Sequence, residues 1–407
     1  MLILERASFP SLPAVSAPFI LPHTMALLDE IGADEREYAD STPKLRGFVL
    51  ELADYFRAVF PFEAELAGRS YFYTIDRARL DHSLWKNLER FPSVTARTSA
   101  KVVDLLRDGE RVAGVVVERE GATEQLRADA IVGADGRFSL VARKAGAKVT
   151  EERPDVSTTV YYDFWEGLAD YDDSGQLLAQ IFSSCDGFSA VIMPTSDARA
   201  IVLMQARADR FAARGGAPED NYEAILRERP RVWRRLEGAR RSGTLSGMKK
   251  VGNLFREPGG AGWALVGDAY HQKDSIDAQG IYDALIGSKL LAEQLIAWRR
   301  GERSWEQAIS SYGERVYGVC KPMFDATMGR LEREIYSDPP PFVARSLMRW
   351  MLTHPEYGRR YARFLTRELA PADFMPPPVM LKLIATGAFG RLGRRIRGND
   401  PTDPIQL

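Results

Sequence analysis

Cysteine and histidine are scarce in this chain. Its 407 residues include only 2 cysteines, Cys185 and Cys320, and 4 histidines. Two cysteines form at most one bridge, which excludes a disulfide framework. None of the histidines stands at zinc-ligand spacing from a cysteine or from another histidine, so we expect no His/Cys metal site.

The chain also lacks an excess of either charge and a long apolar run. Lys and Arg total 55 against 56 for Asp and Glu, a formal net charge of −1, whereas nucleic-acid-binding chains are usually basic. No uninterrupted apolar run reaches the ~18 residues of a membrane span. Glu5, Arg6 and several prolines interrupt the apolar N-terminus, so we expect no export signal. The chain is therefore expected to be cytoplasmic and to bind no nucleic acid; its oligomeric state is not indicated.

What the chain does contain is enough apolar residues for a large globular protein. Hydrophobic residues make up 45% and charged residues 27%. Short apolar runs predict buried strands at residues 2–5, 129–133 and 262–267. Residues 101–120 predict a hairpin around Asp108-Gly109, and the four strand-like runs of 155–208 indicate an antiparallel meander.

Helical spacing of apolar residues occurs elsewhere. The expected helices cover residues 24–31, 76–88, 219–238 and 281–299. From Trp305 onward the pattern is helical, and we expect breaks at Pro322 and at the later prolines, because proline disrupts a helix interior. Residues 47–60 are apolar at mixed spacing and receive no assignment.

Two short strands end in similar Gly-Asp turns, in IVGADGRFS (131–139) and ALVGDAYH (264–271). Glycine permits a sharp turn and close approach to a ligand. An aspartate at the carboxyl end of a parallel strand can bind a ligand hydroxyl there, or it can cap the following helix. Each turn by itself favours the cap, whereas two such turns about 130 residues apart form a more specific pattern.

The order of LILERASFP, DRARLDHSL (76–84), VVDLLRDGERVAGV, IVGADGRFS and ALVGDA resembles the FAD-dependent monooxygenase family. That family is built like para-hydroxybenzoate hydroxylase and includes geranylgeranyl-reductase-like and halogenase-like flavoproteins. The resemblance implies an α/β fold with a Rossmann-like parallel sheet that binds FAD, an antiparallel substrate sheet and a helical C-terminal region. The implied divisions are 1–153 and 256–300 for FAD binding, 154–255 for the substrate sheet and 301–407 for the helical region.

The resemblance also implies residues for the adenosine and phosphate end of FAD. The acid that ends the second family strand binds the adenosine ribose and corresponds to Glu5. An arginine ahead of a Leu-Asp pair contacts the flavin phosphate region and corresponds to Arg77. The backbone of the strand after this helix meets the adenine at about Val102.

Further residues are implied for the flavin end. Asp135-Gly136 belongs to a motif for flavin and nicotinamide-nucleotide binding, and Asp268 of Gly267-Asp268 would bind the ribityl chain. Gln279-Gly280-Ile281 would begin a helix whose N-terminus faces the flavin pyrimidine, where the helix dipole favours negative charge. Asp277, in the preceding turn, is expected to cap this helix. Ser275 stands where the family commonly has proline.

The family's G-x-G-x-x-G turn does not occur in these residues. The single G-x-G, Gly260-Ala261-Gly262, has Leu265 at the third glycine position, and only four residues precede Glu5. We therefore expect a parallel sheet without its first strand and without the pyrophosphate cradle, through a mis-assigned start or a truncation. Residues 2–5 are expected either to border a solvent-open gap with few hydrogen bonds or to shift and pair with 130–134. Weak FAD binding should follow.

The implied function is an FAD-dependent monooxygenase that uses NADPH or NADH to hydroxylate an apolar or aromatic small molecule. We name no catalytic side chain, because in this family the flavin carries the chemistry. The alternatives are a flavin-dependent reductase of an isoprenoid-like double bond and a non-catalytic remnant that does not hold FAD. Residues of the meander that suit an apolar ligand are Tyr161, Tyr162, Phe164, Trp165, Phe182, Phe188 and Met193.

Other chemistry is weakly indicated. No G-x-S-x-G is present, which argues against a serine hydrolase, and the tryptophan-rich motif of flavin halogenases is absent. Arginines 391, 394, 395 and 397 follow the apolar stretch VMLKLIATGAFG. This segment could lie on an acidic membrane surface, but we favour a solvated C-terminal helix.

Overall fold

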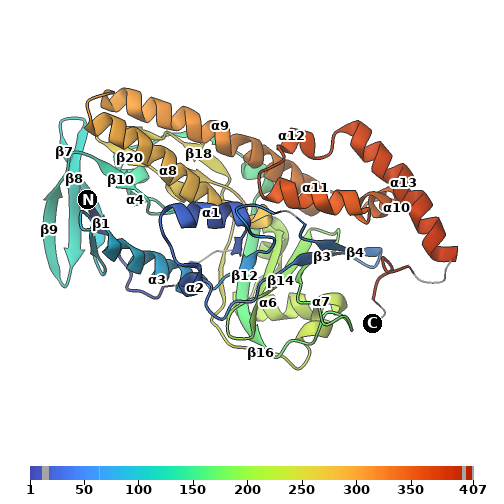
Figure 1. Ribbon diagram of the computed structural model, residues 1–407. Coiled ribbons are helices and arrows are strands. Elements are labelled where there is room, and N and C mark those ends of the chain that lie inside the picture. The colour runs from blue at the N-terminus through green and yellow to red at the C-terminus, as the bar shows by residue number, and fades with distance from the viewer. Residues whose placement is uncertain (12–17, 64, 397–399, 406–407) are drawn as a thin grey trace.

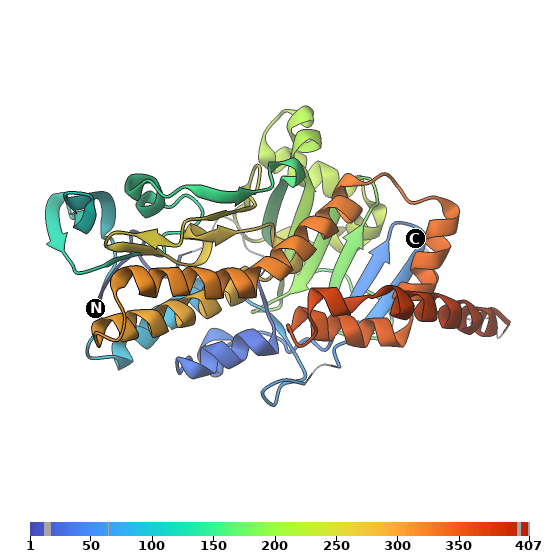
Figure 2. The same cartoon turned by 90° about the horizontal axis from the view of Figure 1, so that it is seen from above.

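The computed structural model describes residues 1–11, 18–63, 65–396 and 400–405. Two long helices, α8 (Gly280–Arg299) and α9 (Trp305–Leu331), lie side by side along several small sheets at one end of the molecule (Figure 1). Seen from above, α9 continues diagonally to a large sheet at the other end, where the C-terminal helices gather (Figure 2). The two ends of the molecule are therefore joined by α9.

The small sheets contain the three short strands expected from the sequence. β1 (Leu2–Leu4) pairs in parallel with β6 (Thr95–Arg97), whereas β10 (Ile131–Gly133) pairs in parallel with β20 (Trp263–Leu265). The single parallel sheet that the family resemblance implies is therefore not formed among the described residues; these strands belong to two separate parallel pairs. Both sheets are parallel, but no strand among the described residues joins β1 to β10 by hydrogen bonds.

The expectation for residues 2–5 is corrected as well. These residues do not shift across to β10; all three residues of β1 are in register with β6, and the Glu5 amide donates to the Arg97 carbonyl at 2.9 Å. They are therefore not short of hydrogen bonds. Among the described residues, each of β1 and β10 has a strand partner on one edge only, and Val132 of β10 is exposed.

The expected hairpin is confirmed. β7 (Lys101–Asp108) and β8 (Arg111–Arg119) turn at Asp108-Gly109, and β9 (Ala122–Arg127) extends the sheet. Gly109 has φ +58°, a conformation that favours glycine.

The expected meander is confirmed as the centre of a larger sheet with the order β16-β12-β15-β14-β13-β3-β4, in which β17 also pairs with β12. Residues 47–60, unassigned from sequence, form a hairpin at its end, where β3 pairs in parallel with β13. The strands of this sheet are β3 (Gly47–Leu52), β4 (Phe56–Pro61), β12 (Thr158–Glu166), β13 (Ala179–Ser183), β14 (Phe188–Pro194), β15 (Arg199–Arg207), β16 (Arg240–Arg241) and β17 (Ser246–Met248).

Most helix predictions hold, with two corrections. The expected helix at 219–238 is two helices, because Pro230 interrupts it. Pro322 does not break α9, because α9 is buried along much of its length and packing outweighs the ~3 kcal/mol that an interior proline costs. The other helices are α1 (Pro22–Glu30), α2 (Glu35–Tyr38), α3 (Arg77–Asn87), α4 (Leu140–Ala145), α5 (Ala208–Arg214), α6 (Pro218–Arg227), α7 (Pro230–Leu236), α10 (Phe342–Leu352), α11 (Pro355–Leu365), α12 (Pro371–Phe374) and α13 (Pro377–Ile396).

Short strands complete the structure. They are β2 (Phe19–Ile20), β5 (Tyr73–Thr74), β11 (Val149–Glu152), β18 (Leu254–Arg256), β19 (Gly259–Gly260) and β21 (His271–Gln272). No helix within the described ranges has the length and apolar character needed to cross a membrane.

Apolar cores lie on both faces of the large sheet. One face packs against α5, α6 and α7, and the other packs against α9, α11 and neighbouring segments. A further core lies between the small sheets and the helices α8 and α9. The N-terminus of α8 lies where the small sheets, α9 and the C-terminal helices meet.

Candidate functional site

The first Gly-Asp turn follows β10. The Asp135 carboxylate accepts hydrogen bonds from Ser139 Oγ at 2.5 Å and from the amides of Leu140 and Val141 at 2.7 and 3.0 Å. These amides belong to the first turn of α4, whose N-cap residue is Ser139, so Asp135 satisfies two more free amides at this helix start. Gly136 has φ +76°, and a Cβ added there would meet no atom within 4 Å, so the turn is open on its outer side.

The second Gly-Asp turn follows β20 and lies against α8. Gly267 has φ +61°, and a Cβ there would lie 3.4 Å from Ala284 of α8. Asp268 pairs with Arg137 Nε at 3.0 Å. Arg137 also donates to the Lys273 carbonyl at 2.8 Å. Arg137 therefore links the two turns, which lie at the carboxyl ends of neighbouring parallel strands.

The N-terminus of α8 has no side-chain cap. The side chain of its N-cap residue, Gln279, makes no hydrogen bond to the first helical turn. Instead, Gln279 Nε2 donates to the Leu365 carbonyl at 3.0 Å and Gln279 Oε1 accepts from Arg367 Nε at 2.9 Å. A Cβ added at Gly280 would meet no atom within 4 Å, and Ile281 is half-buried. The positive end of a 20-residue helix therefore begins beside open space.

The expectation that Asp277 caps α8 is wrong. Its buried carboxylate pairs with Arg330 Nη1 at 2.7 Å and accepts from Thr327 Oγ1 at 2.8 Å. Both partners belong to α9, which was not visible from local spacing. Asp277 therefore ties the turn before α8 to α9.

A buried polar cluster lies behind the start of α8. Asp283, in the first turn of α8, pairs with Lys273 and with Arg367 Nη2, the latter at 2.6 Å. Burial opposes ionisation of Asp283, but the charges of Lys273 and Arg367 outweigh it and hold the pKa of this carboxyl well below its ordinary value. Two cations against one carboxylate leave the cluster with an excess positive charge beside the α8 N-terminus.

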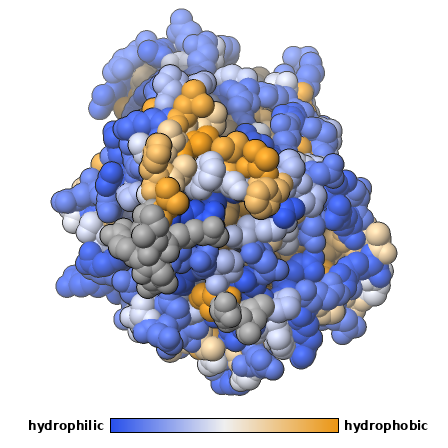
Figure 3. Space-filling model, turned by 90° about the vertical axis from the view of Figure 1, so that its right-hand side faces the viewer, coloured by the Kyte–Doolittle hydropathy of each residue, from blue (hydrophilic) through white to orange (hydrophobic). Residues whose placement is uncertain are grey.

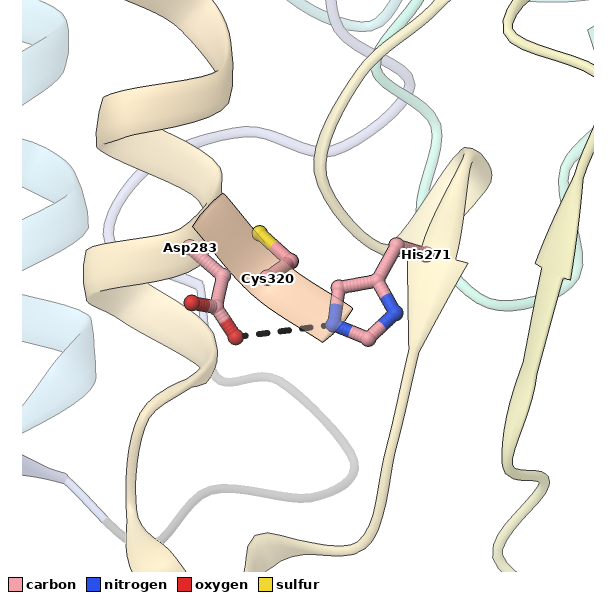
Figure 4. A group of neighbouring side chains, drawn as sticks. All are labelled: His271, Asp283 and Cys320. Atoms are coloured by element: carbon pink, nitrogen blue, oxygen red, sulfur yellow. Dashed lines mark ion pairs between the residues drawn. The ribbon is translucent and has the colours of Figure 1, made fainter. Parts of the chain in front are cut away.

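His271 and Cys320 complete this cluster (Figure 4). His271 Nε2 approaches Asp283 Oδ2 at 3.6 Å, yet burial lowers the pKa of His271, and both ring nitrogens lack a hydrogen-bond partner. Burial raises the pKa of Cys320 to about 12, so this free cysteine stays a thiol. The three residues have ligand-type atoms within 4.8 Å of one another, but the Asp283 carboxylate is already neutralised by cations, which disfavours a metal ion.

His23 lies on the other side of α8. Its ring is 4.3 Å from that of Tyr282, between centroids, and both of its nitrogens are buried without a partner. Burial, aided by the charge of Arg367, lowers the pKa of His23 to about 3. The imidazole is therefore neutral at physiological pH.

Asp274 connects the α8 approach segment to the large sheet. Its carboxylate accepts from Thr158 Oγ1 of β12 and from Gln205 Nε2 of β15, and all three residues are buried. Burial raises the pKa of Asp274, and hydrogen bonds from Thr158 and Gln205 only partly oppose it. This contact fixes the large sheet relative to the segment that leads into α8.

The residues implied for the other end of FAD lie just after β1, on β7 and on α3, and α3 shares an apolar cluster with the start of α8. The Glu5 carboxylate accepts from the Ala7 amide at 2.8 Å, and its carbonyl accepts from Ala100, just before β7. Val102 lies in β7, so Glu5 and Val102 are near one another. Arg77 begins α3 and pairs with Asp81 at 2.9 Å.

The cavities near these residues differ in size. A space of about 10 Å³ is lined in part by Gly267, His271, Asp283 and Cys320, which is at most the size for one water molecule. A more open hollow of about 430 Å³ lies on the α6–α7 side of the large sheet, beside Trp165. Neither is the open space at Gly280.

The flavin end of FAD fits the α8 start. The uncapped amides, the open space at Gly280 and the orphaned buried atoms of His23, His271 and Ser275 provide unsatisfied polar groups of the kind a bound ligand would satisfy. Asp268 at the adjacent turn is a hydrogen-bond acceptor for hydroxyl groups. The glycine-rich G-x-G-x-x-G turn, a common pyrophosphate cradle, does not occur in the 407 residues.

Residues 1–327 match the family model described as an FAD binding domain. The chain belongs to this flavoprotein family. The expected family is thereby confirmed. The expected enzyme class, FAD-dependent oxidoreductase and monooxygenase, is confirmed as well, and its relatives include proteins named as reductases and hydroxylases.

Among relatives, a digeranylgeranylglycerophospholipid reductase of Methanocella arvoryzae is 22% identical over 284 residues, which cover 69% of this chain and 70% of the reductase. The ubiquinone hydroxylase UbiL of Rhodospirillum rubrum is 27% identical over 235 residues, 56% of this chain and only 50% of the hydroxylase. The flavin-dependent brominase Bmp2 has the same fold, with a TM-score of 0.75 at 19% identity over 97% of this chain and 93% of the brominase.

The structure adds residues that sequence reasoning missed. Arg137 stands within the quoted Gly-Asp motif and was overlooked, although a basic residue next to an acidic turn is a usable signal. Lys273 and Asp283 flank the α8 start at a spacing that carries no local pattern. Arg367 comes from the loop after α11, and only the tertiary structure brings it to α8.

Proposed function

We propose that this chain binds FAD with the flavin ring against the N-terminus of α8 and hydroxylates an apolar or aromatic small molecule. The observation that carries the proposal is the uncapped start of α8, with open space at Gly280 and with excess positive charge from Lys273 and Arg367 behind it. Helix N-termini favour anionic groups, and a reduced flavin carries negative charge.

The chain's own residues would bind and orient the cofactor. Asp268, held by Arg137, would accept hydrogen bonds from the ribityl hydroxyls. The amides of Gly280 and Ile281 would donate to the pyrimidine edge of the ring. When bound, FAD would supply electron transfer from NADPH or NADH and the activation of oxygen.

The opposite end of FAD would lie along the small sheets. Glu5 would accept from the adenosine ribose, the backbone near Val102 would contact the adenine, and Arg77 would pair with the phosphate region. The turn at Asp135-Gly136 would approach FAD or the nicotinamide nucleotide through its open outer side. These four roles rest on the family resemblance.

The substrate would contact the large sheet on its α9 side. Of the residues expected to suit an apolar ligand, Tyr162, Phe164 and Met193 belong to the core on this side. The others, Tyr161, Trp165, Phe182 and Phe188, pack against α5–α7 on the opposite face. Alternation along the strands therefore leaves about half of the expected set for the substrate.

A flavin-dependent reductase is the second candidate function. It is supported by the reductase relative, which aligns over 284 residues at 22% identity. The same α8 start would hold the flavin, and the substrate would carry an isoprenoid-like double bond. The two candidates differ in whether oxygen is a substrate.

A matched pair of glycine variants tests the flavin site. Gly280→Leu would place a side chain in the open space at the α8 start, whereas Gly318→Leu places one in open space on α9. Both side chains meet no atom at the Cβ position, so both variants should fold. We expect Gly280→Leu to weaken FAD binding by at least about tenfold and Gly318→Leu to leave it unchanged. Equal affinities in the two variants would contradict the site.

Oxygen consumption then separates the functions. With FAD bound, a monooxygenase should couple NADPH or NADH oxidation to oxygen uptake, and the hydroxylated product should carry label from ¹⁸O₂. A reductase should oxidise the nicotinamide anaerobically when a polyprenyl substrate is present. If excess FAD does not bind to the chain at all, both functions are excluded and the non-catalytic alternative stands.

A further inference from the structure

The C-terminal helices expose a large apolar surface. Seven apolar side chains of α10 and α13 are between 37% and 79% exposed. We call them the C-terminal apolar face; they are Phe342, Val343, Leu347, Met380, Leu381, Phe389 and Leu392. Figure 3 shows apolar side chains gathered on the side of the molecule where these helices lie. Contiguous exposed apolar surface on a protein typically marks an interaction site.

The two helices are packed so that these side chains form one surface. A Cβ at Gly387 of α13 would lie 2.2 Å from the Trp350 carbonyl of α10, so glycine permits close contact there. Farther along α13, Arg391 shares the Asp400 carboxylate with Arg349 of α10. Nearer the start of α13, Lys382 pairs with Glu356 of α11, which follows α10, at 2.9 Å. Contacts earlier in α13 therefore involve residues later in the α10–α11 segment, so α13 runs antiparallel to it.

Leu381, Phe389 and Leu392 lie on one side of α13, whereas Met380 is about 180° around the helix from Phe389. At 100° per residue, positions 381, 389 and 392 fall within about 80° of one another. The face opposite to them contains Gly387 and Leu383, which are buried. This side of α13 is exposed, as expected for a solvated helix, but it is apolar.

Charge is distributed very unevenly between this region and the rest of the chain. Residues 342–407 contain 11 Lys and Arg against 5 Asp and Glu, a net charge of +6. The other 341 residues contain 44 against 51, a net charge of −7. The α10 sequence and residues 377–397 contain no acidic residue at all. Arg394 and Arg395 belong to the last turn of α13, and Arg397 lies outside the described residues.

We propose that the C-terminal apolar face docks on the surface of an anionic phospholipid bilayer. The apolar side chains would enter the boundary between headgroups and acyl chains, and the surrounding basic region would meet the anionic headgroups. A second copy of the chain is disfavoured as the occupant, because a two-fold contact would bring one +6 region against another. The proposal does not depend on flavin binding.

Vesicle co-sedimentation tests this proposal on the full chain. We expect wild type to bind phosphatidylcholine vesicles that contain phosphatidylglycerol, to bind pure phosphatidylcholine much more weakly, and to be released by salt. Phe389→Ser/Leu392→Ser should lower the partition coefficient by at least about tenfold. The matched control is Phe138→Ser, because Phe138 is 76% exposed and lies outside α10 and α13, between β10 and α4; it should bind as wild type does.

A charge variant provides an independent arm. Arg394→Glu/Arg395→Glu should reduce binding to the anionic vesicles and leave the weak binding to neutral vesicles unchanged. The proposal is overturned if wild type does not bind anionic vesicles, or if the Phe389→Ser/Leu392→Ser variant binds them as wild type does. It is also overturned if wild type sediments as a dimer that this variant dissociates, since the face would then join two copies.

Discussion

Replacing Arg367 by methionine should destabilise the folded chain by about 3 kcal/mol. Arg367 follows α11, yet its guanidinium donates to Asp283 Oδ1 at 2.6 Å and to Gln279 Oε1 at 2.9 Å, both at the start of α8. It also lies 4.9 Å from the centre of the Tyr282 ring. Methionine retains most of the apolar stem and removes the charge and the donors.

The magnitude follows from these two hydrogen bonds. Asp283 and Gln279 are almost fully buried, so neither acceptor gains water when the guanidinium is lost. Hydrogen bonds to charged groups contribute ~1.5–3 kcal/mol each, and removing one partner of a buried pair can cost ~3–5 kcal/mol. Lys273 still pairs with Asp283 in the variant, which keeps the loss near the lower end of this range.

Urea unfolding of wild type and variants measures the effect. Arg363→Met is the matched control, because Arg363 is on the same part of the chain but half-exposed, with its nearest acid, Glu368, at 3.8 Å. It should lose less than ~0.5 kcal/mol. A loss in Arg367→Met no larger than in the control would refute the reasoning. Adding Asp283→Asn to Arg367→Met should cost less than the two single losses together, because the two side chains interact directly.

Other predictions concern pH, cofactor binding and helix packing. The pKa of His23 is about 3 when folded and ~6.5 when unfolded, so the unfolded chain takes up the proton first as pH falls, and stability declines below pH ~6.5. Urea unfolding should show ~2 kcal/mol of this loss at pH 5, absent in His23→Phe; the same pH slope in both would contradict it. Asp268→Ala should weaken FAD binding by ~1–3 kcal/mol in a flavin titration, and an unchanged dissociation constant would remove its assigned role. Gly387→Ala should cost ~1–3 kcal/mol in thermal or urea unfolding, since its methyl would meet the Trp350 carbonyl, and unaltered stability would show that α13 can shift away.

The sequence alone predicts the elements whose signals are local. The hairpin at 101–120 follows from Asp108-Gly109 between two apolar runs, and the helix at 76–88 follows from its spacing; Asp76 caps it by accepting from the Ala78 amide. The meander of 155–208 and the long helix at 281–299 are correct for the same reason. The order of the two Gly-Asp motifs also identifies the family, which the match over residues 1–327 confirms.

The tertiary structure decides the features that depend on residues far apart in the chain. Residues 47–60 form strands because β3 finds β13, more than 120 residues later, and α9 continues through Pro322 because it is buried. The resemblance predicts the start of α8 at Gly280, but not its surroundings. Asp277 pairs with α9 instead of capping α8, and Arg367 reaches Asp283 across 84 residues. Local spacing determines which segments form helices and strands. A buried charge needs an opposite charge beside it once folding removes it from water, and only the folded chain brings that opposite charge to it.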